Sequence, residues 1–169
     1  MSTVTTKVWS QPSPLGWLEV EMSPAGIRRL WIRRDASERG LVDAGVSAAL
    51  DAYLAGDLGA VDGLNVDLSG CRPLATTVLG LLRLVPAGNV TTYGGLAAAA
   101  GRLGAARAVG QVVAANPVAI VVPCHRVVAS GGRLGGYSGG LDRKRWLLAH
   151  EGAGALVGGW EPRRRRPPS

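Results

Sequence analysis

The feature that most constrains the fold is a run of apolar residues, Val118–Val122, that leads directly into Pro123–Arg126. A short apolar run of this kind is typical of a strand buried on both faces. Asn116-Pro117 precedes the run and should end any earlier helix, because the residue before a proline disfavours helical backbone. The whole apolar stretch, Ala114–Cys124, is too short to span a bilayer. We therefore expect a soluble protein in which this segment is a buried strand leading into Cys124.

Composition and charge limit the class of protein. With 169 residues the chain can form one medium domain or two small ones. It has no Phe, so Leu, Val, Ala and five Trp must fill the core. The net charge is +7, and residues 75–155 hold eight basic and two acidic side chains, against seven and nine in residues 1–74. A polyanionic partner would therefore dock on the C-terminal half.

The first 70 residues predict a small α+β unit. Strand-like and helix-like patterns alternate with turn signals, and the segment holds neither Cys nor His. We expect a scaffold without chemistry of its own. The expected elements are strands over residues 3–9, Leu15–Glu21 and Ile27–Ile32, a break at Pro12–Pro14, a turn at Ser23–Gly26, a helix over Val42–Leu54 and a linker over Gly59–Gly70.

From Leu74 the pattern becomes mostly helical. Two short helices flank a turn at Gly101–Gly104, which is typical of a helix-turn-helix. The tail Gly158–Ser169 carries four consecutive arginines between prolines and is expected to be disordered. The expected elements are helices over Leu74–Val85, Thr92–Ala100 and Ala105–Ala115, a hairpin or extended segment over Arg126–Gly132, and a last helix over Arg143–His150, capped by Asp142 and closed by Gly152.

The two cysteines, Cys71 and Cys124, exclude a disulfide framework and a zinc-ligand set. The N-terminus lacks the charged and apolar regions of a signal peptide. We therefore expect a cytoplasmic protein in a reducing compartment.

Cys124 is a candidate nucleophile, although a free Cys is more often a small buried apolar residue. Its thiol needs a neighbouring base or positive charge, because the ordinary pKa of about 8.5 leaves little thiolate at neutral pH. His125 is adjacent, but neighbouring residues of a strand point to opposite faces. A Cys–His pair here thus requires a turn, or a water between the groups. Glu151 could orient the imidazole, as in other nucleophile relays, or could be a solvated helix end.

Asn116-Pro117 with Ile120–Val128 resembles the active-site segment of the O6-alkylguanine-DNA alkyltransferases, the methylated-DNA–protein-cysteine methyltransferase family. Five ordered motifs at compatible spacing make the resemblance specific over about Leu74–Gly152. It is loose before that, where only Pro14–Gly16 fits. The further matching stretches are Pro86–Gly88 with Thr92–Gly94, Ala106–Gly110, Gly136–Leu141, and Lys144 with Leu147–Gly152.

The resemblance implies DNA repair by direct reversal. An alkyl group, usually methyl, would pass irreversibly and once only from O6-alkylguanine to Cys124, after the nucleotide is flipped out of the duplex, without cofactor or metal. The implied site roles are Cys124 as acceptor, His125 as base through a water, Glu151 orienting His125, Asn116 holding the turn before the cysteine segment, Tyr93 donating a proton toward the guanine ring and contacting the 3′ phosphate, Arg107 filling the vacated stack, Tyr137 and Ser138 shaping the pocket, and the carbonyls near Cys124 and Val127 reading the exocyclic amine.

The same considerations predict an α/β protein of two parts. A small N-terminal α+β scaffold domain would span residues 1–70, and a mostly helical domain with a winged helix-turn-helix-like motif would span residues 71–155. A basic flexible tail, residues 156–169, would follow. The partner would be double-stranded DNA containing O6-alkylguanine, bound through its minor groove. We expect a monomer without a membrane or obligate protein partner; cooperative self-association on DNA stays open.

The sequence differs from the family's usual pattern at some positions, and two other functions stay open. Leu74-Ala75 and Val78-Leu79 stand where the family usually carries Phe-Gln and Val-Trp, and we expect repacking there. The N-terminal zinc site of some members cannot form. One alternative is a non-catalytic module that flips alkylguanine, although relatives of that type replace the cysteine. Another is a helix-turn-helix regulator with an incidental cysteine.

Overall fold

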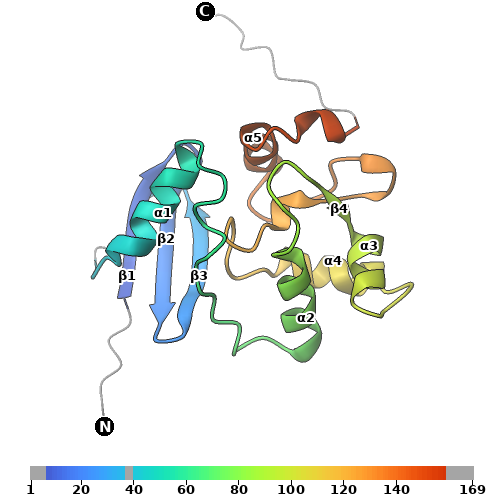
Figure 1. The fold of residues 1–169 in the computed structure, drawn as a ribbon, viewed down its shortest axis with the longest axis horizontal. Coiled ribbons are helices and arrows are strands. Elements are labelled where there is room, and N and C mark those ends of the chain that lie inside the picture. Colours follow the sequence, from blue (N-terminus) through green and yellow to red (C-terminus); the bar gives the residue numbers. More distant parts are fainter. Residues whose placement is uncertain (1–6, 37–39, 159–169) are drawn as a thin grey trace, which may run out of the picture.

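The computed structural model describes residues 7–36 and 40–158. Its N-terminal part is an antiparallel sheet in the order β1-β2-β3, with α1 packed on one face (Figure 1). The expected hairpin and helix are confirmed, whereas residues 3–6 of the first expected strand lie outside the described residues. The elements are β1 (Lys7–Ser13), β2 (Gly16–Ser23), β3 (Gly26–Arg33) and α1 (Ala44–Leu54).

Pro12 does not break the first strand, so that expectation was wrong. β1 continues through Pro12, which pairs with Trp17 of β2. Because β1 is an edge strand, one side of its backbone needs no partner, and proline is tolerated there.

The two faces of the sheet differ in character. Trp9, Val20 and Leu30 stand opposite one another across the strands and are buried in one cluster with residues of α1. Glu19 and Trp31 stand opposite one another on the other face, and Trp31 is 38 % exposed. The outer face of β3 is thus free to border a site.

The C-terminal part is mainly helical, as expected. Thr92 caps α3, its hydroxyl accepting a hydrogen bond from the Gly95 amide at 3.0 Å. Asp142 is not the cap of the last helix: the helix begins at Leu141 after Gly140, whose φ of 97° makes the turn into it. The elements are α2 (Pro73–Leu82), β4 (Thr91–Thr92), α3 (Tyr93–Ala99), α4 (Ala106–Ala114), β5 (Val127–Val128), which pairs in parallel with β4, and α5 (Leu141–His150).

The apolar run Val118–Val122 is buried except at Ala119, which is partly exposed, but it is not a strand. Only Val118 makes a β-bridge, to Leu30 of β3, and the chain then passes through turns. Asn116 makes the turns possible: its Nδ2 donates to the Val122 carbonyl at 2.8 Å, and its Oδ1 accepts from the Val118 amide at 3.0 Å. A side chain thus supplies the hydrogen bonds that a neighbouring strand would otherwise make.

The two parts are joined along the edge of β3. The Leu30 amide donates to the Pro117 carbonyl at 2.9 Å, and the Ala119 amide donates to the Leu30 carbonyl at 3.1 Å. Arg143 adds a second tie, donating to the carbonyls of Leu15 at 3.0 Å and Ile32 at 3.1 Å. The chain before Cys124 is therefore fixed against the N-terminal sheet.

The remaining expectations concern connections and the chain end. Residues 59–70 form no helix or strand of their own, as expected for a linker, although Val66 bridges to Ile27. The arginine tail falls at residues 159–169, outside the described residues. Within the described ranges, no helix is long and apolar enough to cross a membrane.

Candidate active site

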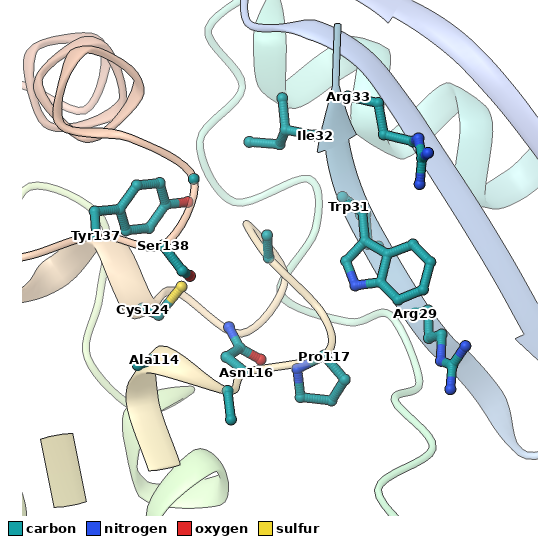
Figure 2. A pocket seen from close by; sticks show the side chains of 14 residues that line it. Arg29, Trp31, Ile32, Arg33, Ala114, Asn116, Pro117, Cys124, Tyr137 and Ser138 are labelled. Carbon is teal, nitrogen blue, oxygen red and sulfur yellow. The ribbon is translucent and has the colours of Figure 1, made fainter. Parts of the chain in front are cut away.

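A single turn of 3₁₀ helix, Cys124–Arg126, forms the centre of the site. In a strand, the side chains of neighbouring Cys and His residues would point to opposite faces. A turn is therefore required here for the two to act together, and the 3₁₀ helix is such a turn. Cys124 is almost completely buried and lies with Tyr137 and Ser138 at the border of a groove (Figure 2). His125 is fully buried on the inner side.

His125 is held by the carboxylate of Glu151. The distance between His125 Nε2 and Glu151 Oε1 is 2.9 Å. An ionised carboxylate only accepts, so Nε2 carries the proton and Nδ1 is left as an acceptor. Among the described residues, His125 Nδ1 is the one buried side-chain nitrogen or oxygen without a hydrogen-bond partner. The imidazole is therefore oriented at one nitrogen and free to take a proton at the other.

Glu151 is itself fixed by three side chains. Besides His125, Arg126 donates to it through Nε at 2.9 Å and Nη2 at 2.7 Å, and the Tyr53 hydroxyl donates at 2.7 Å. Burial alone would raise the pKa of Glu151, but the hydrogen bonds from His125 and Arg126 outweigh it and lower the pKa. The carboxylate is therefore ionised at neutral pH.

Burial sets the protonation of Cys124 and His125. It raises the pKa of the Cys124 thiol, against hydrogen bonds from Asn116 and Tyr137 that favour the thiolate. It also lowers the pKa of His125, although Glu151 acts in the opposite direction. At neutral pH Cys124 is thus a thiol and His125 a neutral imidazole, whose Nδ1 has no hydrogen-bond partner among the described residues.

Lys144 is a buried cation beneath the site. Its Nζ donates to the Val127 carbonyl at 2.6 Å and to the Gly136 carbonyl at 3.0 Å, so it ties β5 to the loop before Tyr137. Burial lowers the pKa of Lys144 to about 8, while the nearby Cys124 acts to raise it. A positive charge here favours the thiolate of Cys124.

Cys124 borders two cavities. A pocket of about 150 Å³ lies between the helical part and the loop at Gly136–Ser138, and Tyr93, Tyr137 and Ser138 line it. A groove of about 620 Å³ extends from Cys124 past Asn116 to β3. Seven of the nine expected site residues thus converge: Cys124, Asn116, Tyr93, Tyr137 and Ser138 line the cavities, and His125, the neighbour of Cys124, is hydrogen-bonded to Glu151.

The other two expected residues lie elsewhere. Arg107 is exposed on α4 and lines neither cavity. Val127 is fully buried, and its carbonyl already accepts the hydrogen bond from Lys144. Their expected roles stay predictions.

Three contributors were missed from the sequence: Tyr53, Arg126 and Lys144. Arg126 stands beside His125, so its position was a usable signal. Tyr53 lies 98 residues before Glu151, and nothing in the local sequence marks the pairing. The N-terminal part, expected to be a scaffold without chemistry of its own, thus also supplies one hydrogen bond to the site. Within residues 7–36 and 40–158, no group of three or more His, Cys, Asp or Glu side chains is placed to hold a metal ion.

Several known proteins are similar to this chain in sequence. Residues 73–153 match the family described as 6-O-methylguanine DNA methyltransferase, DNA binding domain. A methylated-DNA–protein-cysteine methyltransferase of Salmonella typhimurium is 52% identical over 108 residues, which are 64% of this chain and 63% of that protein. A DNA base-flipping protein of Thermus thermophilus is 39% identical over 145 residues, 84% of this chain and 97% of that one.

A solved structure extends the likeness to the whole fold. The crystal structure of Mycobacterium tuberculosis OGT in complex with DNA has a TM-score of 0.74 and 33% identity, and the match covers 89% of this chain and 94% of that one. The family match spans α2 to α5 and the Cys124 turn, and the fold match reaches the N-terminal sheet as well. The chain belongs to the methylated-DNA–protein-cysteine methyltransferase family.

Proposed function

We propose that the protein repairs DNA by transferring the alkyl group of O6-alkylguanine irreversibly to Cys124. The observation that carries the proposal is the relay behind the thiol, in which Glu151 holds His125 Nε2 and leaves Nδ1 available. The aligned region covers 63% of the Salmonella relative, less than two thirds of its length, so the activity, substrate and partner are inferences for this chain.

The reaction balances without a cofactor. The Cys124 thiol gives its proton to His125 Nδ1 through a water, and Glu151 stabilises the imidazolium. The thiolate attacks the alkyl carbon, a new C–S bond forms, and the bond from that carbon to O6 breaks. Guanine leaves with the electron pair and takes a proton from Tyr93, which borders the same pocket. The thioether is not cleaved, so each molecule acts once.

Helices α3 and α4 supply the DNA interface. In this proposal they are the two helices of a helix-turn-helix, and its winged form is supported only by the short parallel pair of β4 and β5. Arg107 on the exposed face of α4 would enter the stack in place of the flipped nucleotide, since a planar guanidinium stacks on bases. We assign the scaffold to residues 1–70 and the DNA-binding domain to residues 71–155, docked on the minor groove.

Intact mass spectrometry tests the proposal. Incubation with a duplex containing O6-methylguanine should add one methyl group to the wild-type protein, localised to Cys124, and nothing to Cys124→Ala. A protein that keeps its mass while the lesion persists would contradict the proposal.

A second function is favoured by one observation, the likeness to a base-flipping protein over 97% of that protein's length. In this reading the protein flips the damaged nucleotide and binds it without reaction. The same experiment separates the two, because binding alone gives tight association with the damaged duplex and no mass change. The relay around Cys124 favours transfer, since binding alone needs no base for the thiol.

A further inference from the structure

Ile120 has a backbone conformation that isoleucine rarely adopts. Its φ is 70°, and among the described residues it is the one residue other than glycine with a positive φ. In this region the Cβ of an L-residue crowds the backbone, and a branched Cβ increases the crowding. Such strain persists only where the surrounding structure imposes it, and it is concentrated at functional sites. Because Ile120 lies four residues before Cys124, the strain is close to the nucleophile.

The strained conformation belongs to a tight turn. The Val121 amide donates a hydrogen bond to the Ala119 carbonyl at 2.8 Å, so the bond spans only Ile120. A hydrogen bond of this span defines a γ-turn, and a positive φ at its central residue marks the rare, strained form. The turn gives the Val121 amide the partner that a neighbouring strand would otherwise provide. The direction of the chain therefore depends here on the backbone angles of one residue, Ile120.

A second tight turn follows and ends at the nucleophile. The Cys124 amide donates to the Val122 carbonyl at 2.8 Å across Pro123, whose φ of −82° and ψ of 66° are those of the common inverse γ-turn. Figure 2 shows the chain folding back between Pro117 and Cys124. The proline ring fixes the φ of the second turn covalently. No ring fixes the φ of Ile120, so noncovalent contacts must hold it.

The buried side chain of Ile120 supplies those contacts. It is 1 % exposed and belongs to the same core cluster as Leu30 of β3. Both ends of the turn are also fixed, since the Ala119 amide donates to the Leu30 carbonyl at 3.1 Å and Asn116 donates to the Val122 carbonyl at 2.8 Å. A branched side chain is stiff about χ1, so its burial also restricts the backbone that carries it. Glycine would adopt the same φ without strain, but it would adopt many other conformations as readily.

We propose that Ile120 is a positioning residue for alkyl transfer: its strained turn, held by the buried side chain, directs the Cys124 thiol toward the pocket. The proposal rests on the transfer reaction proposed above. Ile120 lines neither cavity, so it acts only through the path of the chain. This path leaves Cys124 at the pocket while His125, the next residue, is fully buried. A displacement of a reacting group by about 1 Å can lower a rate by about 100-fold, so the path matters for transfer.

The test compares Ile120→Gly with Ile27→Gly. Ile27 is the matched control, because it is fully buried in the same core cluster but lies in β3 and has no positive φ. Transfer from a duplex containing O6-methylguanine is followed by intact mass under single-turnover conditions, and the denaturation temperature and the affinity for the duplex are measured on the same preparations. The alanine pair, Ile120→Ala and Ile27→Ala, gives the same comparison of rates if a glycine variant does not fold.

The expected results for rate and stability run in opposite orders. Ile120→Gly should slow transfer about tenfold to 100-fold, with nearly unchanged affinity for the duplex, because the thiol is no longer held in one direction. The fall should be equal for free O6-benzylguanine. Ile27→Gly should lower the denaturation temperature more, because glycine relieves no strain there, yet keep nearly the wild-type rate. Ile120→Val retains the branched Cβ and should also keep nearly the wild-type rate.

Three outcomes would overturn the proposal. A wild-type rate in both Ile120→Gly and Ile120→Ala would make Ile120 a core residue only. Rates that fall in step with the denaturation temperature at both isoleucines would indicate a general loosening of the core. A fall confined to the duplex, with weaker binding, would place the effect at the DNA interface instead. Failure of the proposed function is distinct, since the wild-type protein would then gain no mass from the damaged duplex.

Discussion

The relay and the outer face of α4 are built in opposite ways. Glu151 is buried and accepts hydrogen bonds from three side chains, one of them from the N-terminal part. Arg107 is exposed and makes no hydrogen bond or ion pair with another described residue. The reacting groups are therefore held in position by the folded protein itself. Arg107, which is expected to contact DNA, has no hydrogen-bond or ion-pair partner among the described residues. Changes in the relay should slow transfer from any substrate, and changes on α4 should matter only when the substrate is a duplex.

Glu151→Gln gives the largest expected effect. The amide keeps the shape of the side chain but loses the charge that holds His125 and stabilises its protonated form. The transfer rate should fall about 100-fold, a typical contribution of a positioned acid or base. The fall should be the same for a duplex and for free O6-benzylguanine, with the affinity for DNA nearly unchanged. A large loss of DNA affinity would assign Glu151 a structural role. The contrast between a buried relay for chemistry and an exposed α4 face for DNA binding would then not hold.

The pH dependence of the transfer rate in Glu151→Gln tests whether His125 is the base. Protonated His125 cannot accept the thiol proton, so the rate falls as the pH drops through the pKa of His125. The negative charge of Glu151 raises that pKa against the effect of burial. Without the charge the pKa moves lower, and the acid side of the rate profile should shift to lower pH while the plateau falls. An unshifted profile would mean that His125 is not the base.

Arg107→Ala tests the role of the outer face of α4 in binding DNA. Repair of O6-methylguanine in a duplex should slow about tenfold, because nothing fills the stack when the nucleotide leaves, and a base–side-chain stack contributes about 1–3 kcal/mol. Reaction with free O6-benzylguanine should be unchanged, since the free base needs no flipping. Arg107→Lys keeps the charge without the planar fork and should restore only part of the rate. Equal losses on both substrates would count against the stacking role.

The sequence predicted the helical part better than the sheet side of the site. Cys124, His125 and Glu151 were candidates from their chemistry, the resemblance added a role for Asn116, and the structure brings all four together. The buried segment at Val118–Val122 was assigned as a strand because apolar runs predict burial but not the hydrogen-bond partner. Here a side chain of Asn116 takes the place of a neighbouring strand.

The residues of the N-terminal part that border the site were not predicted, because contacts between distant parts of the chain bring them there. Tyr53 and Glu151 meet because the C-terminal ends of α1 and α5 come together, where the Tyr53 ring also contacts that of His150. Trp31 reaches the groove because the edge of β3 pairs with the segment before Cys124. Neither contact follows a local period or motif, so only the assembled structure reveals that the N-terminal sheet borders the site.

Tyr53→Phe gives the smallest expected effect and asks whether the N-terminal part belongs to the relay. It removes one hydrogen bond to Glu151 and leaves those from His125 and Arg126 in place. The free energy of unfolding should fall by about 1 kcal/mol, the typical contribution of one hydrogen bond. Transfer should slow about twofold to fivefold on duplex and free base alike, a fraction of that same hydrogen-bond energy. The acid side of the rate profile should stay in place, because Glu151 remains ionised.

A double-mutant cycle separates positioning from general stability. If Tyr53 acts on the reaction through Glu151, then Tyr53→Phe should have no further effect on the rate in the Glu151→Gln background, although it would still lower stability. An additive loss of rate in the double variant would mean that Tyr53 influences the site by another route. A loss of stability without any change in rate would make Tyr53 a purely structural contact, and the relay would then belong to the C-terminal part alone.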